Sequence, residues 1–242
     1  MKVLTIDTSN QLMAVGIGID RQLIGSYVSS SKNHSVTLMP AIDFLMKEAG
    51  WQPQEIERII VAKGPGSYTG LRIGVTTAKT LAWTLDAELL AVSSLAVLAA
   101  NTDSAAEDVL IVPLMDARRK NIYTGAYQWQ QGQLVNVLPD RHVSLAEWLQ
   151  LLKKQPVDSV RFIGRDAPQF AGDILLDFPA DSLPNQTVLH QVQPVSMLEL
   201  ADDAEVVANI GGFTPEYLKR VEAEEKWLEG HHEELTSYVE RT

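Results

Sequence analysis

The sequence contains no cysteine. A chain without thiols forms no disulfide, no thiolate nucleophile, no iron–sulfur cluster and no zinc site built on cysteine. This composition favours a reducing compartment, the cytoplasm. Asp7 interrupts the N-terminal apolar stretch where the hydrophobic region of a secretory signal would lie, so we expect no signal peptide.

Long uninterrupted apolar runs are also missing. The most apolar region, residues 73–100, is broken by Lys79, Asp86 and Glu88. A membrane-spanning helix needs about 20 consecutive apolar residues. The sequence therefore predicts no membrane span.

Positive charge is scarce, because 20 Lys and Arg stand against 31 Asp and Glu and give a net charge of −11. Affinity for nucleic acids comes mostly from clustered basic side chains. We therefore expect no large independent RNA-binding surface, and any contact with tRNA is expected only indirectly, through a partner. Two small basic clusters, at residues 118–120 and 153–154, are interpreted as solvated surface charge.

The signatures of two hydrolase classes are absent from the sequence. The five histidines are scattered, and the adjacent His231 and His232 would point in different directions on a helix, which does not suit a metal site. A serine-hydrolase elbow requires G-x-S-x-G, but Ser67 has Pro65 and Thr69 at the flanking positions. We therefore predict no catalytic residue and no metal ligand.

The order of apolar and polar segments suggests that one architecture occurs twice. Each half is expected to contain an apolar strand that ends in an aspartate, two further strands and a helix. The expected ranges are 3–7, 13–19, 23–29 and 35–49 in the first half, then a strand ending at Asp116, 121–129, 134–137 and 145–153 in the second. The predicted division is residues 1–102, residues 103–213, and a docked helix and tail over residues 214–242.

A glycine-rich loop, GPGSYTG at residues 64–70, follows a predicted strand and opens a predicted helix. Such a loop directs backbone N–H groups at an anion, although the spacing is neither that of a Walker A loop nor of a dinucleotide fingerprint. An equally acceptable interpretation is a tight turn that permits close packing. The residues after the first strand would lie beside it, and a carboxylate there suits hydrated magnesium. The candidate nucleotide pocket, vestigial in character, comprises Asp7, Thr8, Ser9, Gly64, Pro65 and Gly66.

Tight binding of ATP by this chain alone is not expected, because the turn at residues 8–11 contains no glycine to let the backbone approach a phosphate. The chain is expected to require no cofactor. ATP and magnesium are expected to bind only weakly or within a complex.

A stripe of small side chains recurs every fourth residue along the predicted helix after the loop. Its members are Gly66, Gly70, Gly74, Ala78 and Ala82. A face of this kind lets another backbone approach closely, and that backbone is either the chain's own core or a partner. The neighbouring Tyr68, Leu71, Arg72 and Ile73 favour a partner, because aromatic residues and arginine are enriched at the centres of interfaces.

Several segments in the same order along the chain resemble the bacterial TsaB (YeaZ) family. They are IDTS, AKGPGSYTGLRIG, LLAVSSL, LMDARRKNIYTGAY and PEYLKRVEAEEKW. The resemblance implies an α/β protein with the duplicated actin-like (ASKHA, ribonuclease H-like) fold, in two subdomains with mixed sheets. It also implies a part in forming threonylcarbamoyladenosine beside the anticodon of tRNAs that read codons beginning with A.

In that system the resemblance implies a non-catalytic activator or scaffold. Its partners would be TsaD, the threonylcarbamoyl transferase with which it forms a heterodimer, and the ATPase TsaE, and the free protein would be a homodimer. The paralogue TsaD binds its metal with two histidines in an N-H-L-x-x-H segment. Ser94 and Leu98 stand at those positions here, and leucine offers no ligand atom.

The resemblance further implies that two helical segments form the surface that meets TsaD or a second copy. The expected contact residues are His34, Leu38, Ile42, Leu45, Tyr68, Thr69, Gly70, Leu71, Arg72, Ile73, Gly74 and Ala78. On this expectation, Gly74→Leu should prevent pairing and leave the isolated fold largely intact. The rival interpretations are a small-molecule kinase or ATPase of the same fold, based on Asp7 and the glycine-rich loop, and a peptidase, for which no nucleophile and base are found.

Overall fold

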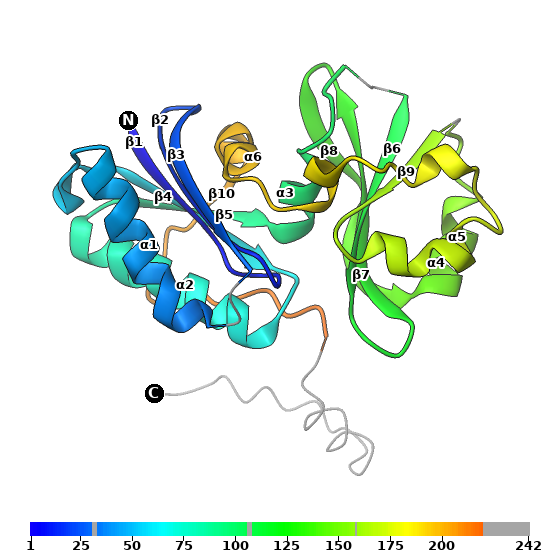
Figure 1. Ribbon diagram of the computed structural model, residues 1–242, viewed down its shortest axis with the longest axis horizontal. Coiled ribbons are helices and arrows are strands. Elements are labelled where there is room, and N and C mark those ends of the chain that lie inside the picture. Colours follow the sequence, from blue (N-terminus) through cyan, green and yellow to red (C-terminus); the bar gives the residue numbers. More distant parts are fainter. Residues whose placement is uncertain (31–32, 106–107, 158, 220–242) are drawn as a thin grey trace, which may run out of the picture.

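The protein, described by a computed structural model over residues 1–30, 33–105, 108–157 and 159–219, consists of two lobes (Figure 1). The first lobe contains a six-stranded sheet in the order β10-β5-β4-β1-β2-β3, and the second contains a four-stranded sheet in the order β8-β7-β6-β9. No helix in the described part of the chain is both long enough and apolar enough to span a bilayer.

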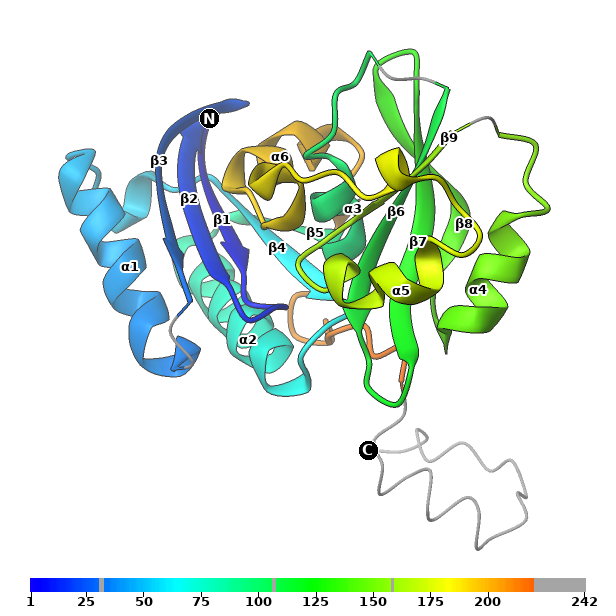
Figure 2. The ribbon, with the colours of Figure 1, turned by 45° about the vertical axis from the view of Figure 1, so that its right-hand side comes forward.

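The first lobe begins with an antiparallel meander and continues with strands parallel to β1. The bounds are β1 Lys2–Asp7, β2 Met13–Ile19, β3 Gln22–Ser29, α1 His34–Glu48, β4 Arg58–Gly64, α2 Tyr68–Leu85, β5 Glu88–Ser93 and α3 Ser94–Ala99. Helices α1 and α2 lie side by side over one face of this sheet, and α3 and α6 (Pro194–Glu199) lie over the other (Figures 1 and 2).

Helices on both faces explain why the middle of β4, residues 59–62, is apolar at four consecutive positions. Ile59 and Val61 belong to the core under α1 and α2, whereas Ile60 and Ala62 belong to the core that contains α3 and α6. Successive side chains of a strand point to opposite faces, so the part of a strand that is covered on both sides is apolar at successive positions.

The second lobe repeats the element order of the first, which confirms the expected duplication. Its elements are β6 Val109–Asp116, β7 Asn121–Gln130, β8 Gln133–Ser144, α4 Leu145–Leu152, β9 Ser159–Ile163 and α5 Ala171–Ile174. In each lobe the first strand pairs antiparallel with the second, and parallel with the strand that follows the helix. Helix α4 packs under the sheet through Trp148, which is fully buried.

The chain then returns to the first lobe. Helix α6 packs on the meander, and β10 (Glu205–Val206) pairs antiparallel with β5. The expected range 103–213 for the second unit therefore includes a segment that completes the first sheet. The expected boundary is therefore wrong. The sequence could not show it, because a strand of so few residues leaves no periodicity.

The described part of the predicted C-terminal helix, residues 214–219, is not helical. It is nevertheless docked. The Glu216 N–H donates to the Lys63 carbonyl at 2.8 Å, and the Tyr217 ring lies 4.9 Å from that of Tyr68, centroid to centroid. The rest of the predicted helix and tail, residues 220–242, lies outside the described residues.

Candidate functional site: an interlobe cleft and a helical face

A polar cleft of about 590 Å³ opens between the lobes, at the carboxyl ends of β1, β4 and β6. Open α/β sheets usually bind ligands at this end of the strands. The first lobe contributes residues 9–11 and the start of α2, from Gly66 to Thr69. The second lobe contributes the end of β6 and the turn after it, together with Tyr123, Asp166 and Gln169. Lys219 also lines the cleft.

Only part of the predicted nucleotide pocket reaches this cleft. Ser9 and Gly66 line it, but Asp7, Thr8, Gly64 and Pro65 do not, and all four are buried. The loops after β1 and β4 bond directly to each other, since the Ser67 N–H donates to the Ser9 carbonyl at 2.7 Å. A Cβ on Gly66 would lie 2.3 Å from that same oxygen. These glycines permit close packing of two loops, and the pocket predicted from the six residues is wrong.

The Asp7 carboxyl group is fully buried at the end of β1. Its Oδ1 accepts from the Ser9 N–H at 2.7 Å, whereas Oδ2 has no hydrogen-bond partner among the described residues. Burial raises the pKa of Asp7, and the Ser9 hydrogen bonds and the nearby His34 oppose that rise. The residues at the end of β1 thus do not fit a magnesium ion held above a phosphate in the cleft, because no carboxylate oxygen of Asp7 is accessible.

We expect Asp7→Asn to stabilise the protein at neutral pH, because the amide keeps the oxygen that accepts from Ser9 and removes a buried charge. The folded-state pKa is raised above the ordinary 3.8, so folding of the wild type becomes less favourable as pH rises from 3.8 through that raised value. The advantage of the variant should therefore be small near pH 3.8, grow through this window, and persist at pH 7. Urea unfolding at several pH values measures it.

Asp7→Ala is the control, since it removes the charge and also the acceptor for Ser9. It should cost about 1–3 kcal/mol relative to Asp7→Asn at every pH. A wild type more stable than Asp7→Asn at pH 7 would contradict our account of this carboxyl group and would point to a bound cation.

The stripe of small residues on α2 faces the chain's own first lobe. A Cβ on Gly70 would lie 2.1 Å from the Thr8 carbonyl oxygen, and one on Gly74 would lie 2.2 Å from the Thr8 hydroxyl oxygen. Ala78 and Ala82 are buried in the same core. The partner interpretation of this stripe is therefore wrong, and the interpretation as a contact with the chain's own core is correct.

Most of the other expected interface residues are also core residues. Leu38, Ile42, Leu45 and Leu71 are at most 5% exposed, and His34 is 8% exposed with its Nε2 3.0 Å from the Asn10 carbonyl oxygen. Buried side chains offer no surface to a partner, which corrects these positions. Accessible members of the set are Tyr68, Thr69, Arg72 and, in part, Ile73.

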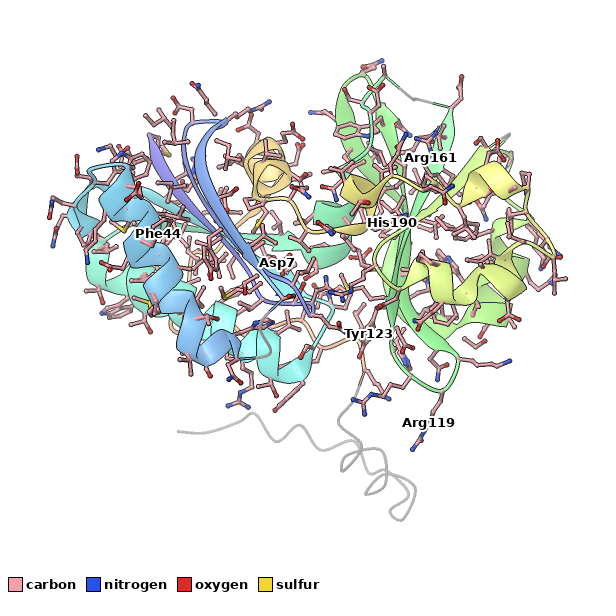
Figure 3. The ribbon with its side chains drawn as sticks, viewed as in Figure 1. Asp7, Phe44, Arg119, Tyr123, Arg161 and His190 are labelled. Carbon is pink, nitrogen blue, oxygen red and sulfur yellow. The ribbon has the colours of Figure 1, made fainter. Side chains whose placement is uncertain are left out.

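Sequence reasoning missed the apolar residues that α1 and α2 expose. Val36 is 69%, Met39 48% and Phe44 52% exposed on α1, and Trp83 is 74% exposed on α2. We call these four residues the exposed apolar helix face, and Phe44 is labelled in Figure 3. A signal existed in the sequence, because Val36, Met39 and Phe44 of α1 are apolar and lie outside the stripe of Leu38, Ile42 and Leu45.

A part-buried polar cluster joins the lobes and was likewise missed. Asp140 of β8 accepts from the Ser93 hydroxyl at 2.5 Å and from the Tyr127 hydroxyl at 2.5 Å. Burial raises the pKa of both Asp140 and Tyr127. Ser93 also caps α3 by accepting from two backbone N–H groups. The cluster therefore links the end of β5 to the second sheet.

Comparison with known proteins identifies the family. The family model described as "TsaD: tRNA N6-adenosine threonylcarbamoyltransferase" matches residues 28–227. The tRNA threonylcarbamoyladenosine biosynthesis protein TsaB of Bacillus subtilis (strain 168) is 43% identical over 233 residues, which cover 95% of this chain and 99% of that protein. The chain belongs to the TsaB family.

Another TsaB protein and a solved structure are also similar to this chain. The Escherichia coli (strain K12) protein is 26% identical over 128 residues, 53% of this chain and 55% of that protein. The structure of YeaZ from Pseudomonas aeruginosa superposes with a TM-score of 0.71 at 24% identity and covers 90% of this chain and 99% of that one. The duplicated actin-like α/β fold expected from the resemblance is thereby confirmed.

The two positions at which the resemblance led us to expect histidines in the paralogue lie in α3. Ser94 and Leu98 are 0% and 2% exposed there. Both belong to the helix that packs between the lobes. Among the described residues, no three His, Asp or Glu side chains gather in a group able to hold a metal ion.

Proposed function

We propose that this TsaB-family chain takes part in forming threonylcarbamoyladenosine in tRNA as a non-catalytic partner of a TsaD-type transferase. The relatives from Bacillus subtilis and Escherichia coli are named as proteins of threonylcarbamoyladenosine biosynthesis. The observation that carries the proposal is the exposed apolar helix face, where a tryptophan that is 74% exposed stands on a helix with few outward charges. Large exposed aromatic residues are favoured as anchors of protein interfaces.

The outward side of α2 is suited to close docking. Its exposed positions include Thr69, Thr76, Thr80 and Thr84, and Arg72 is the charged residue among them. The lysine on this helix, Lys79, donates to the carbonyls of Gly211 and Phe213. Little charge on α2 would need to be desolvated on binding, whereas α1 carries the exposed ion pair of Asp43 and Lys47. An interface of common size would bury about 800 Å² on each partner.

The same face would serve a second copy of this chain when the transferase is absent, which makes the free protein a homodimer and the complex a heterodimer. Recruitment of a TsaE-type ATPase and an indirect contact with tRNA complete the proposed role. Support for a non-catalytic role comes from the buried Asp7 and from the loops that bond to each other beside the cleft.

Reconstitution tests the proposal. Purified tRNA, the threonylcarbamoyl-adenylate donor, a TsaD-type transferase and a TsaE-type ATPase should give modified tRNA only when this chain is present, and Asp7→Asn should support the reaction as well as the wild type. Incorporation of labelled threonine into tRNA is the measurement. Modification by this chain without the transferase would overturn the proposal.

A further inference from the structure

Two hydroxyl groups, one from each lobe, donate to a single carboxylate at the junction of the lobes. Ser93 is the last residue of β5 in the first lobe, whereas Tyr127 of β7 and Asp140 of β8 belong to the second. Asp140 accepts from the Ser93 hydroxyl and from the Tyr127 hydroxyl, each at 2.5 Å. We call these three residues the interlobe cluster. Its hydrogen bond from Ser93 to Asp140 connects one sheet to the other.

The second sheet is irregular at the point where it supplies Asp140. The register of β7 with β8 places residues 139–140 opposite Gly125 alone. Two residues opposite one form a β-bulge, which changes the direction of a side chain. A Cβ on Gly125 would lie 2.3 Å from Asp140 Oδ1. The position of this carboxylate therefore depends on the bulge and on the glycine.

The hydrogen bonds of the interlobe cluster are shielded from water. Tyr127 is 3% exposed, and burial raises the pKa of Asp140. Each hydroxyl has one hydrogen and donates it to Asp140, and the two hydroxyl oxygens lie 3.3 Å apart. Hydrogen bonds to a carboxylate are roughly twice as strong as neutral ones. Separation of Ser93 from Asp140 is therefore opposed, because it would leave a desolvated carboxylate with fewer donors.

Apolar packing between the lobes is interrupted beside the interlobe cluster. Helix α3 lies between the lobes (Figures 1 and 2), and one apolar core contains Leu90 and Val92 of β5 together with Ile111 of β6. Next to this core lies a pocket of about 410 Å³, lined in part by the interlobe cluster and by other residues of β5 and β8. The hydrogen bonds thus span a part of the junction that side chains do not fill.

We propose that the interlobe cluster holds the two lobes at one angle and so keeps the cleft at the ends of β1, β4 and β6 at one width. Proteins with a cleft between two lobes commonly change its width by rotation about a hinge. The packing of α3 limits this rotation, and the cluster prevents the remaining movement that the pocket permits. The inference goes beyond the proposed function and does not depend on it, because it concerns the chain without any partner.

Spin labels on two introduced cysteines can report the lobe angle, because the sequence contains no cysteine of its own. Glu48→Cys on α1 and Gln150→Cys on α4 place one label at an exposed position of each lobe. Labelled chain is mixed with an excess of unlabelled chain, so that the measured distances lie within one molecule. Double electron–electron resonance gives the distribution of the interlobe distance, which should be narrow with a single maximum.

Y127F/D140A should widen this distribution by about twofold or more, because the released lobes rotate as rigid bodies. Both residues are replaced, since the hydroxyls of Ser93 and Tyr127 would otherwise bond to each other across 3.3 Å. Ser93 remains and continues to cap α3. Asp177→Ala is the control, because the ion pair of Asp177 with Lys153 lies within the second lobe. Its loss should leave the distribution unchanged.

Two single substitutions test the same cluster in other ways. Asp140→Asn keeps an oxygen that accepts from Ser93 and gains an amide that donates to the Tyr127 oxygen, so its distribution should stay narrow. Gly125→Ala displaces the carboxylate by the contact at 2.3 Å and should widen the distribution, which decides the matter if the double variant does not fold. Urea unfolding shows which variants are folded.

A narrow distribution in either folded variant, Y127F/D140A or Gly125→Ala, would overturn the proposal. It would show that α3 and its apolar core set the lobe angle without the interlobe cluster. A distribution for Asp177→Ala as wide as theirs would overturn it as well, because loss of any carboxylate contact in the second lobe would then have the same effect.

Discussion

Replacing Trp83 with aspartate is expected to abolish stable pairing with a TsaD-type transferase. The indole is 74% exposed, so the substitution removes little from the folded core. A tryptophan anchor at an interface typically contributes about 2–4 kcal/mol, and a buried carboxylate opposite an apolar partner adds a desolvation cost. Affinity should fall by about 30-fold to 1,000-fold or more. Calorimetric titration with the purified transferase measures it.

Leu176→Asp is the matched control, because Leu176 is 82% exposed and lies in the second lobe after α5. It introduces the same charge at another exposed apolar residue and should leave pairing unchanged. A Trp83→Asp chain that pairs normally, or a Leu176→Asp chain that does not, would show that the docking surface lies elsewhere.

Gly70→Ala is expected to destabilise the fold by about 3 kcal/mol or more, at the upper end of the cost of overpacking. The added methyl would lie 2.1 Å from the Thr8 carbonyl oxygen. Neither backbone can move freely, because the Thr8 hydroxyl donates to the Gly70 carbonyl at 2.7 Å. Urea unfolding followed by circular dichroism measures the change.

Gly172→Ala provides the comparison, since a Cβ added there meets nothing within 4 Å. Its effect should be within about 1 kcal/mol and in the stabilising direction, as for a glycine in a helix. If the two variants were equally stable, the close contact between α2 and the turn after β1 would be contradicted. Gly74 has a similar contact, so Gly74→Leu should disrupt the fold itself and reports nothing specific about pairing.

The duplicated architecture was predictable because its signals are local. Short polar turns between apolar segments give hairpins, and an aspartate ends the apolar strand in both halves. Helix periodicity also showed correctly which residues share a side of α2. It does not show which part of the structure that side contacts. The contact is with Thr8, which lies 62 residues away from Gly70 in the sequence.

The site was harder to predict for the same reason. Asp7 was singled out from its position at the end of a strand, but it is buried, and two residues further on the Ser9 carbonyl accepts from the Ser67 N–H. That contact joins two loops far apart in the sequence. The exposed Trp83 was overlooked because an apolar residue in a helix is normally assigned to the core.

The two-residue strand β10 governs the order in which the protein can be completed during translation. The outer edge of β5 is covered only when residues 205–207 arrive, with the Val207 N–H donating to the Leu89 carbonyl at 2.9 Å. A ribosome has by then synthesised the whole second lobe. The lobe that is encoded first is thus finished last, and its open strand edge is a site for mispairing in the nascent chain.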